Sequence, residues 1–308
     1  MPPLVETESV AGEETAIRIE RILCPVDFSE VSEKAYRYAQ SIASHYRAKL
    51  ILQHVVELWQ HPEGDFAPGV EECDGFRQAL LSQAENEVRQ FVGRSAGVQP
   101  ECVVEESMAP DAILAMAQAR DIDLIVMGTH GRRGFDHFML GSVTERVLRR
   151  APCPVLAIPE KAPDQSGRRL GADSVDVRRV LCCVDFSAHS ERALDHAFSV
   201  AEAYNAEVTV LHVLDNISES TDVGKKTNAA LDKLQERVAA RALDPANVDL
   251  EVRLGRAYRE ILDFAAEKHS ELIVTGVRGR NSLDLAVFGS TTYRVIQLYP
   301  GPVLTAPI

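Results

Sequence analysis

The sequence lacks the features of membrane and secreted proteins. No apolar run approaches the roughly 20 residues of a membrane-spanning helix, so we expect no membrane partner. Residues 1–20 are polar and acidic and carry neither the basic start nor the apolar segment of a secretory signal. We therefore expect a flexible N-terminal tail over residues 1–20 and a cytoplasmic protein.

The sequence also lacks an excess of basic residues and Cys-x-x-Cys pairs. The formal net charge is -13 at pH 7 and the pI is about 5.2, which argues against nucleic-acid binding because that needs a basic surface. None of the six cysteines belongs to a Cys-x-x-Cys pair, which is common in zinc and redox sites. We expect Cys24, Cys182 and Cys183 to be buried free thiols in strands. A redox role for Cys182 with Cys183 is the alternative.

Two common catalytic motifs are missing. The sequence has no Gly-x4-Gly-Lys-Ser/Thr motif, so it is not a P-loop NTPase. It has no Gly-x-Ser-x-Gly nucleophile turn either. No residue stands out as a general base for the attack of water on a phosphate, which efficient hydrolysis would need.

Instead, the chain contains an internal repeat. Residues 21–43, "RILCPVDFSEVSEKAYRYAQSIA", match residues 179–201, "RVLCCVDFSAHSERALDHAFSVA". Three further segments match in the same order, down to "APCPVLAIP" at 151–159 and "YPGPVLTAP" at 299–307. The sequence therefore predicts two homologous domains, 21–159 and 179–308, joined by a polar linker at 160–178.

Each repeat alternates short apolar runs with helical segments. In the first repeat we expect strands at 21–27, 49–56, 101–106, 123–127 and 154–158, and helices at 29–46, 75–93, 110–120 and 142–150. Ser29 is a candidate N-cap of the first helix, whose apolar face carries Ala35, Tyr38, Ala39 and Ile42. The strands are continuous apolar runs, which is typical of sheets covered on both faces. The sequence thus predicts an α/β fold with two doubly wound, parallel, five-stranded domains.

A glycine-rich loop recurs in both repeats. Gly128, Gly131, Gly141 and Ser142 reappear 148 positions later as Gly276, Gly279, Gly289 and Ser290, although most residues between them differ. The loop follows a strand and ends at a helix start, where free amides and the helix dipole favour an anion. Glycine permits close backbone approach and positive φ. We expect a phosphate site, to which Ser142, Thr144, Thr291 and Thr292 would add hydroxyl donors; the alternative is a tight connection without a ligand.

Charged and imidazole side chains accompany the loop. Arg132 and Arg133 in the first copy, and Arg278 and Arg280 in the second, would complement a polyphosphate. Asp27 and Asp185 end the first strand of each repeat and are either helix-capping groups or ligand contacts. His54 and His212 are expected to face a packed site beside the sheet, not to act on a substrate. His130, inside the loop, either contacts a phosphate or is solvated.

The combination of Gly-x2-Gly-x9-Gly-Ser, "PVDFS" and "HVV" resembles the universal stress protein family, and the whole chain resembles a tandem member of its ATP-binding subgroup. The resemblance implies a nucleotide-binding, Rossmann-like domain with ATP over the strand ends. In the first domain it implies contacts from Pro25, Asp27, Val55, Met127, Gly128, His130, Gly131, Gly141, Ser142, Val143 and Thr144. In the second domain it implies contacts from Asp185, Val213, Gly276, Gly279, Gly289, Ser290, Thr291 and Thr292.

The second repeat departs from the first at three of these positions. Cys183 replaces Pro25, Thr275 replaces Met127 and Arg278 replaces His130. The occupancy of the second site, and the choice between ATP, ADP and AMP, stay open. We expect Mg²⁺ to be held by the phosphates and not by a protein cage, because few carboxylates accompany the loop.

Three functions are compatible with the sequence. The first is an adenine-nucleotide-binding module in stress response or signalling. The second is a slow ATPase or phosphotransferase, and the third is an interaction scaffold with empty pockets. We expect no catalytic residues, and we expect the acidic segment 57–75 to be a mobile flap without recognisable metal-ligand spacing. The last strands, "PVLAIP" and "PVLTAP", should pair the domains as an internal pseudo-dimer, and a homodimer is also expected.

Overall fold

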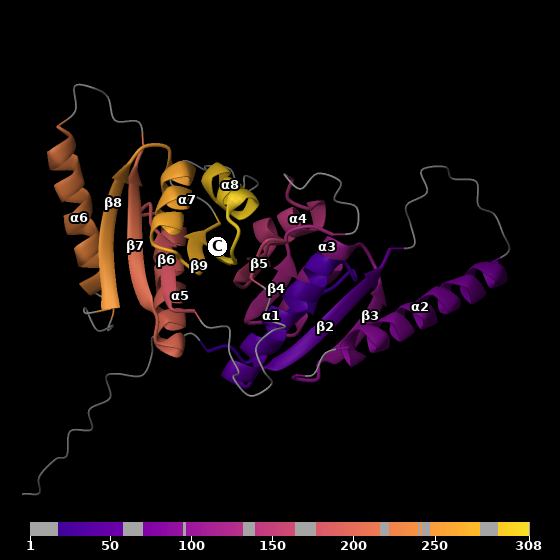
Figure 1. Cartoon of the computed structure of the whole chain (residues 1–308). Helices are drawn as coiled ribbons and strands as arrows, with labels where there is room; N and C mark the ends of the chain where they lie inside the picture. The colour runs from indigo at the N-terminus through magenta and orange to yellow at the C-terminus, as the bar shows by residue number, and fades with distance from the viewer. Residues whose placement is uncertain are drawn as a thin grey trace, which may run out of the picture.

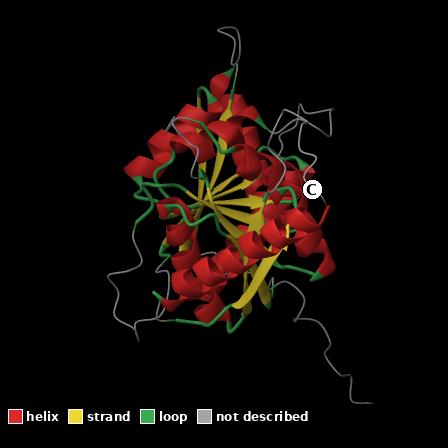
Figure 2. Cartoon of the chain, turned by 90° about the vertical axis from the view of Figure 1, so that its right-hand side faces the viewer, coloured by secondary structure: helices red, strands yellow, loops and turns green. Residues whose placement is uncertain are grey.

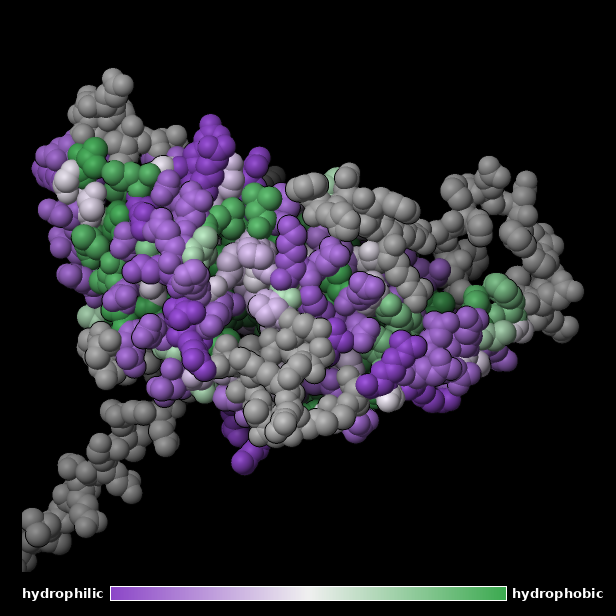
Figure 3. All heavy atoms as spheres, in the orientation of Figure 1, coloured by the Kyte–Doolittle hydropathy of each residue, from purple (hydrophilic) through white to green (hydrophobic). Residues whose placement is uncertain are grey.

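The computed structural model describes residues 18–57, 70–94, 97–131, 139–163, 177–215, 222–239, 241, 247–277 and 289–307. These residues form two α/β units that share one ten-stranded sheet (Figure 1). Within them, no helix combines the length and the apolar character needed to cross a bilayer. The face of the molecule in Figure 3 is mainly hydrophilic where it is described.

The first unit alternates strands with helices. Its strands are β1 (Arg21–Pro25), β2 (Lys49–Val56), β3 (Glu101–Glu106), β4 (Leu124–Gly128) and β5 (Val155–Ile158). Its helices are α1 (Glu30–Tyr46), α2 (Val70–Gly93), α3 (Ala109–Ala119) and α4 (Ser142–Arg150).

The second unit repeats this order. Its strands are β6 (Arg179–Cys183), β7 (Glu207–Leu214), β8 (Val248–Leu254), β9 (Leu272–Gly276) and β10 (Val303–Ala306). Its helices are α5 (Ala188–Tyr204), α6 (Val223–Ala239), α7 (Ala257–Glu267) and α8 (Ser290–Leu298).

The two units have the same strand order. The sheet runs β3-β2-β1-β4-β5-β10-β9-β6-β7-β8, and all neighbours within one unit are parallel. Helices cover both sides of the twisted strands (Figure 2), and a separate cluster of buried apolar side chains lies on each face. The predicted α/β class with doubly wound parallel domains is confirmed.

The two units meet through their last strands. β5 and β10 pair antiparallel, and Leu156 lies opposite Leu304, the residue 148 positions later. A residue that pairs with its own repeat equivalent lies on a local pseudo-twofold axis. The antiparallel pairing removes two apolar sheet edges, as expected from the sequence of both strands.

Local signals placed the first helix correctly. Ser29 caps α1, since its hydroxyl oxygen accepts a hydrogen bond from the Ser32 amide. Tyr38 is only 1% exposed, and the other three residues of the predicted apolar face are also buried. The second helix was predicted too short, because α2 begins at Val70 and not at residue 75. The expected flap therefore loses its last residues to α2, and residues 58–69 lie outside the described part.

Candidate functional site

The candidate site lies where the strand order reverses. β1 sits between β2 and β4, so the chain leaves it in one direction through β2 and returns on its other side through β4. In open α/β sheets, ligands bind in the crevice at such a point, outside the carboxyl ends of the strands. The loops after β1 and β4 flank this crevice, and β6 with β9 form the equivalent point in the second unit.

The turn after β1 has an ordered, repeated geometry. Asp27 Oδ1 accepts hydrogen bonds from the Ser29 amide at 3.1 Å and from the Ser29 hydroxyl at 2.6 Å. Between them, Phe28 has a left-handed backbone with φ of 63°, which is uncommon for a bulky residue and is often found at functional sites. In the second unit, Asp185 accepts from Ser187 in the same way, and Phe186 has φ of 61°. Sequence reasoning missed the strained phenylalanine, although "VDFS" recurs in both copies.

The structure brings the two loops into contact. A Cβ atom on Gly131 would lie 2.5 Å from Asp27 Oδ2, so a larger residue there would require the Asp27 side chain or the loop to shift. Asp27 therefore both organises the start of α1, through Ser29, and borders the glycine loop. The helix-capping role is thus seen in the structure, and the ligand contact stays a prediction.

The described glycines of the loop are explained by close approach and not by positive φ. A Cβ on Gly128 would lie 2.9 Å from Val31 Cγ1, and one on Gly276 would lie 2.9 Å from His189 atoms. A Cβ on Gly141 would lie 3.2 Å from the Thr129 carbonyl oxygen. Among the glycines in the described segments, only Gly255 has positive φ. The expected left-handed backbone is thus absent where the loop is described, and packing against α1 or α5 accounts for Gly128 and Gly276.

At the start of α4, first-turn backbone amides are available to a ligand, whereas the Thr144 hydroxyl bonds to the protein itself. The Gly141 amide donates to the Thr129 carbonyl at 2.8 Å, and the buried Thr144 hydroxyl donates to the Gly128 carbonyl at 2.8 Å. The hydroxyl of Thr144 therefore links the start of α4 to the end of β4, and its predicted contact with a ligand stays a prediction. Ser142 and Val143 lead the helix with first-turn amides that have no intrahelical acceptor.

The second unit repeats this arrangement. The Thr292 hydroxyl donates to the Gly276 carbonyl at 2.8 Å, and the Gly289 amide donates to the Val277 carbonyl at 3.1 Å. Ser290 and Thr291 begin α8. Gly279, with the four arginines of the two loops (Arg132, Arg133, Arg278 and Arg280), lies outside the described residues.

The histidines have the packed surroundings expected from the sequence. His54 Nδ1 lies 2.8 Å from the Val26 carbonyl oxygen, and its ring centroid lies 4.3 Å from that of Phe28. His212 repeats both contacts in the second unit, with Val184 and Phe186. His130 lies in the glycine loop, where its Nδ1 is 2.8 Å from the Thr129 hydroxyl.

The remaining predicted contacts line the strand ends. Pro25 ends β1, Val55 is half-buried near the end of β2, and Met127 is buried in β4 beside Gly128. Val213 holds the equivalent position in β7. The structure thus brings residues of three neighbouring strands together at the carboxyl ends of β1, β2 and β4.

The buried thiols are not poised for redox chemistry. Burial raises the pKa of Cys183 to about 12 and raises the pKa of its neighbour Cys182. Because the thiolate is the reactive form, these two cysteines behave as small apolar side chains. Cys183, at the position equivalent to Pro25, is 8% exposed.

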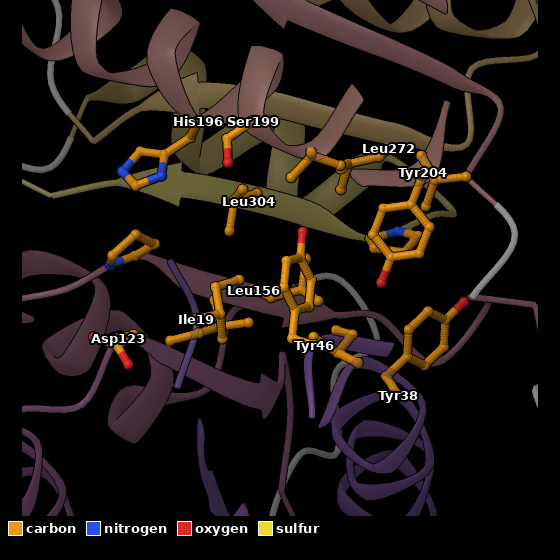
Figure 4. Close-up of a pocket in the computed structure, with 16 residues that line it drawn as sticks. Ile19, Tyr38, Tyr46, Asp123, Leu156, His196, Ser199, Tyr204, Leu272 and Leu304 are labelled. Carbon is orange, nitrogen blue, oxygen red and sulfur yellow. The ribbon is translucent and has the colours of Figure 1, made fainter. Parts of the chain in front are cut away.

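An apolar cavity and the acidic side chains are two further candidates for a binding site. An apolar cavity of about 60 Å³ lies between the units, and Tyr46 and Tyr204 reach into it from opposite sides (Figure 4). Its lining includes none of the predicted nucleotide contacts. Within the described residues, no three His, Cys, Asp or Glu side chains are grouped as metal ligands; most of the acidic segment 57–75 lies outside that part of the chain.

Comparison with known proteins identifies relatives along the whole chain. A profile of the universal stress protein family matches residues 18–159 and again 176–307. A universal stress protein of Mycolicibacterium smegmatis is 29% identical over 295 residues, covering 92% of this chain and 95% of that protein. Universal stress protein Rv2623 of Mycobacterium tuberculosis is 28% identical, with the same coverage. The crystal structure of a universal stress protein from Archaeoglobus fulgidus matches with a TM-score of 0.69 at 24% identity, covering 93% of this chain and 98% of that one, which supports the fold.

Proposed function

From the premise that this chain belongs to the universal stress protein family, we propose that each domain binds one adenine nucleotide and acts as a stress-response or signalling module. The observation that carries this proposal is the contact between the Asp27 turn and the glycine loop at Gly131. This contact places a carboxylate beside the glycine loop at the strand-order reversal, in the loop that leads to the first-turn amides of α4. An aspartate turn beside a glycine loop at this point of the fold suits an anionic ligand of nucleotide size.

The residues of the first domain fit the two ends of such a ligand. Asp27 and the backbone at Val55 would hold the adenosine end, while the amides of Ser142 and Val143 would face the phosphates. The nucleotide would bring negative charge and its own Mg²⁺, since Mg²⁺ commonly uses substrate phosphates and water as ligands. Asp185 and Ser290 would have the corresponding roles in the second domain.

We propose that the nucleotide is held and not rapidly hydrolysed. Amides that stabilise ground-state and transition-state phosphate alike do not accelerate the chemical step. Rapid hydrolysis also needs a group that positions the attacking water. In the described part of the first loop, His130 is the one imidazole, and its Nδ1 already lies beside Thr129. Bound nucleotide would instead bias the loop toward one conformation that a partner recognises.

Mass spectrometry of the denatured, freshly purified protein, followed by calorimetry with ATP, ADP and AMP, tests the binding proposal. We expect two nucleotides per chain, or one if Cys183 and Thr275 weaken the second site. A chain that carries no nucleotide and binds none would support the scaffold alternative.

A single-turnover measurement of ATP loss, on the wild type and on His130→Ala, tests the second part of the proposal. We expect a rate far below 1 s⁻¹, the slow end of ordinary enzymes, and little effect of the substitution. A rate of about 1 s⁻¹ or more that His130→Ala abolishes would make the protein an ATPase.

A further inference from the structure

Three arginines surround one tyrosine at the start of α7. Arg259 Nε donates to the Tyr258 hydroxyl at 3.1 Å, and Arg294 of α8 places its guanidinium 4.9 Å from the centre of the Tyr258 ring. Arg256, the residue before α7, also contributes to the lowered pKa of the Tyr258 phenol. We propose that Arg256, Arg259 and Arg294, with the Tyr258 hydroxyl, form a binding site for a phosphate group on the second domain.

The cluster is unusual because three guanidinium groups gather around one tyrosine. Among the described residues, no carboxylate forms an ion pair with Arg256, Arg259 or Arg294. Their like charges repel one another, and in a chain of net charge -13 acidic partners are plentiful. A multiply charged anion would remove this repulsion and accept hydrogen bonds from several guanidinium groups at once.

The first domain provides an internal comparison. A shift of 148 positions relates the cluster to Met108, Pro110, Asp111 and Arg146. There an acid replaces Arg259, and Asp111 pairs with Arg150 at 3.2 Å. The first domain therefore has an ordinary surface ion pair where the second has a concentration of guanidinium groups, so the inference concerns the second domain alone.

The position of the cluster leaves room for a ligand. α7 follows the carboxyl end of β8, and it packs beside α8 (Figure 1). Arg294, which is exposed, also borders an open groove of about 630 Å³, together with Ser290 of α8 and the Glu145 and Arg149 side chains of α4. Ser290 is the first residue after the glycine loop, so an anion in this groove lies close to the candidate nucleotide site without requiring it.

The pKa of the Tyr258 phenol depends on the charges around it, so it can report on anion binding by spectroscopy. The hydrogen bond from Arg259 and the neighbouring positive charges lower the pKa of the Tyr258 phenol. An anion bound among the arginines would offset that charge and raise the Tyr258 pKa again. The phosphate group has two sources, a free phosphorylated compound or a nucleotide bound in the same domain.

Calorimetry with inorganic pyrophosphate on the full chain tests the proposal. We expect binding that weakens about tenfold or more in Arg259→Asp, which copies Asp111 of the first domain, and in Arg294→Ala, because each loses a charge-assisted hydrogen bond. Arg146→Ala is the matched control, since Arg146 is exposed and is the equivalent of Arg294, and it should leave pyrophosphate binding unchanged. In ¹³C-tyrosine spectra, the signal that Tyr258→Phe removes should shift with pyrophosphate.

Additional variants distinguish an anion bound among the arginines from one bound in the proposed nucleotide site. Pyrophosphate binding should persist in Gly289→Val, which alters the glycine loop. Binding that disappears in Gly289→Val but survives both arginine substitutions would place pyrophosphate in the loop and overturn the inference, as would a wild type that binds none. If both arginine variants also weaken ATP binding, the phosphate group in the cluster belongs to the bound nucleotide. If they weaken only pyrophosphate binding, the phosphate group belongs to a separate phosphorylated compound.

Discussion

Replacing Gly141 by valine should remove the nucleotide site of the first domain. The first Cβ atom would lie 3.2 Å from the Thr129 carbonyl oxygen and 3.5 Å from His130 Cα, and the two Cγ atoms of valine extend further. The loop must move away from α4, which displaces the first-turn amides from the phosphates. Hydrogen bonds to charged groups contribute about 1.5–3 kcal/mol each, so the loss of two corresponds to about 3–6 kcal/mol, a factor of roughly 10² to 10⁴ in affinity.

Calorimetric titration with ATP measures this loss of affinity directly, because the unchanged second domain serves as an internal reference. We expect the stoichiometry to fall from two nucleotides per chain to one, with the affinity of the second domain unchanged. Gly93→Val is the matched control, since a Cβ there meets no atom within 4 Å, and it should retain both sites. Thermal unfolding of Gly141→Val distinguishes a folded variant from a misfolded one. A folded Gly141→Val protein that still binds two nucleotides would refute the phosphate-loop reasoning.

Three further outcomes follow from the contacts described. Asp27→Ala should weaken ATP binding in the first domain about tenfold by calorimetry, and Asp185→Ala should do so in the second domain only; equal effects on both sites would contradict independent crevices. Leu304→Ala, at the pseudo-twofold axis, should lower the free energy of unfolding by about 2–5 kcal/mol in urea titrations, whereas Leu298→Ala, 44% exposed, should change it by less than about 0.5 kcal/mol. Burial lowers the pKa of His196 from 6.5 to about 4, so the unfolded chain binds more protons than the folded chain between these values. Stability should therefore fall as the pH drops through this window, by at most about 3 kcal/mol, and a His196→Gln variant with the same pH slope would show that another group is responsible.

The sequence alone determined the features that depend on local pattern. Continuous apolar runs identified the strands, helical periodicity and Ser29 identified α1, and the recurrence of each segment identified two domains. These signals are local because backbone hydrogen bonding and the burial of one face act within a few residues. Even locally the information has limits: a flap was predicted over residues 57–75, yet α2 begins at Val70.

Only the tertiary structure decided which distant groups meet. Asp27 and Gly131 are far apart in the sequence and come together because β1 and β4 are neighbours, an arrangement that no local period encodes. The fold also decides that the Thr144 hydroxyl donates a hydrogen bond to the Gly128 carbonyl. Likewise, Arg294 contacts the Tyr258 ring because α8 packs on α7. Sheet order and helix packing depend on burying the apolar faces of all elements together, so side-chain neighbours across elements are properties of the whole fold.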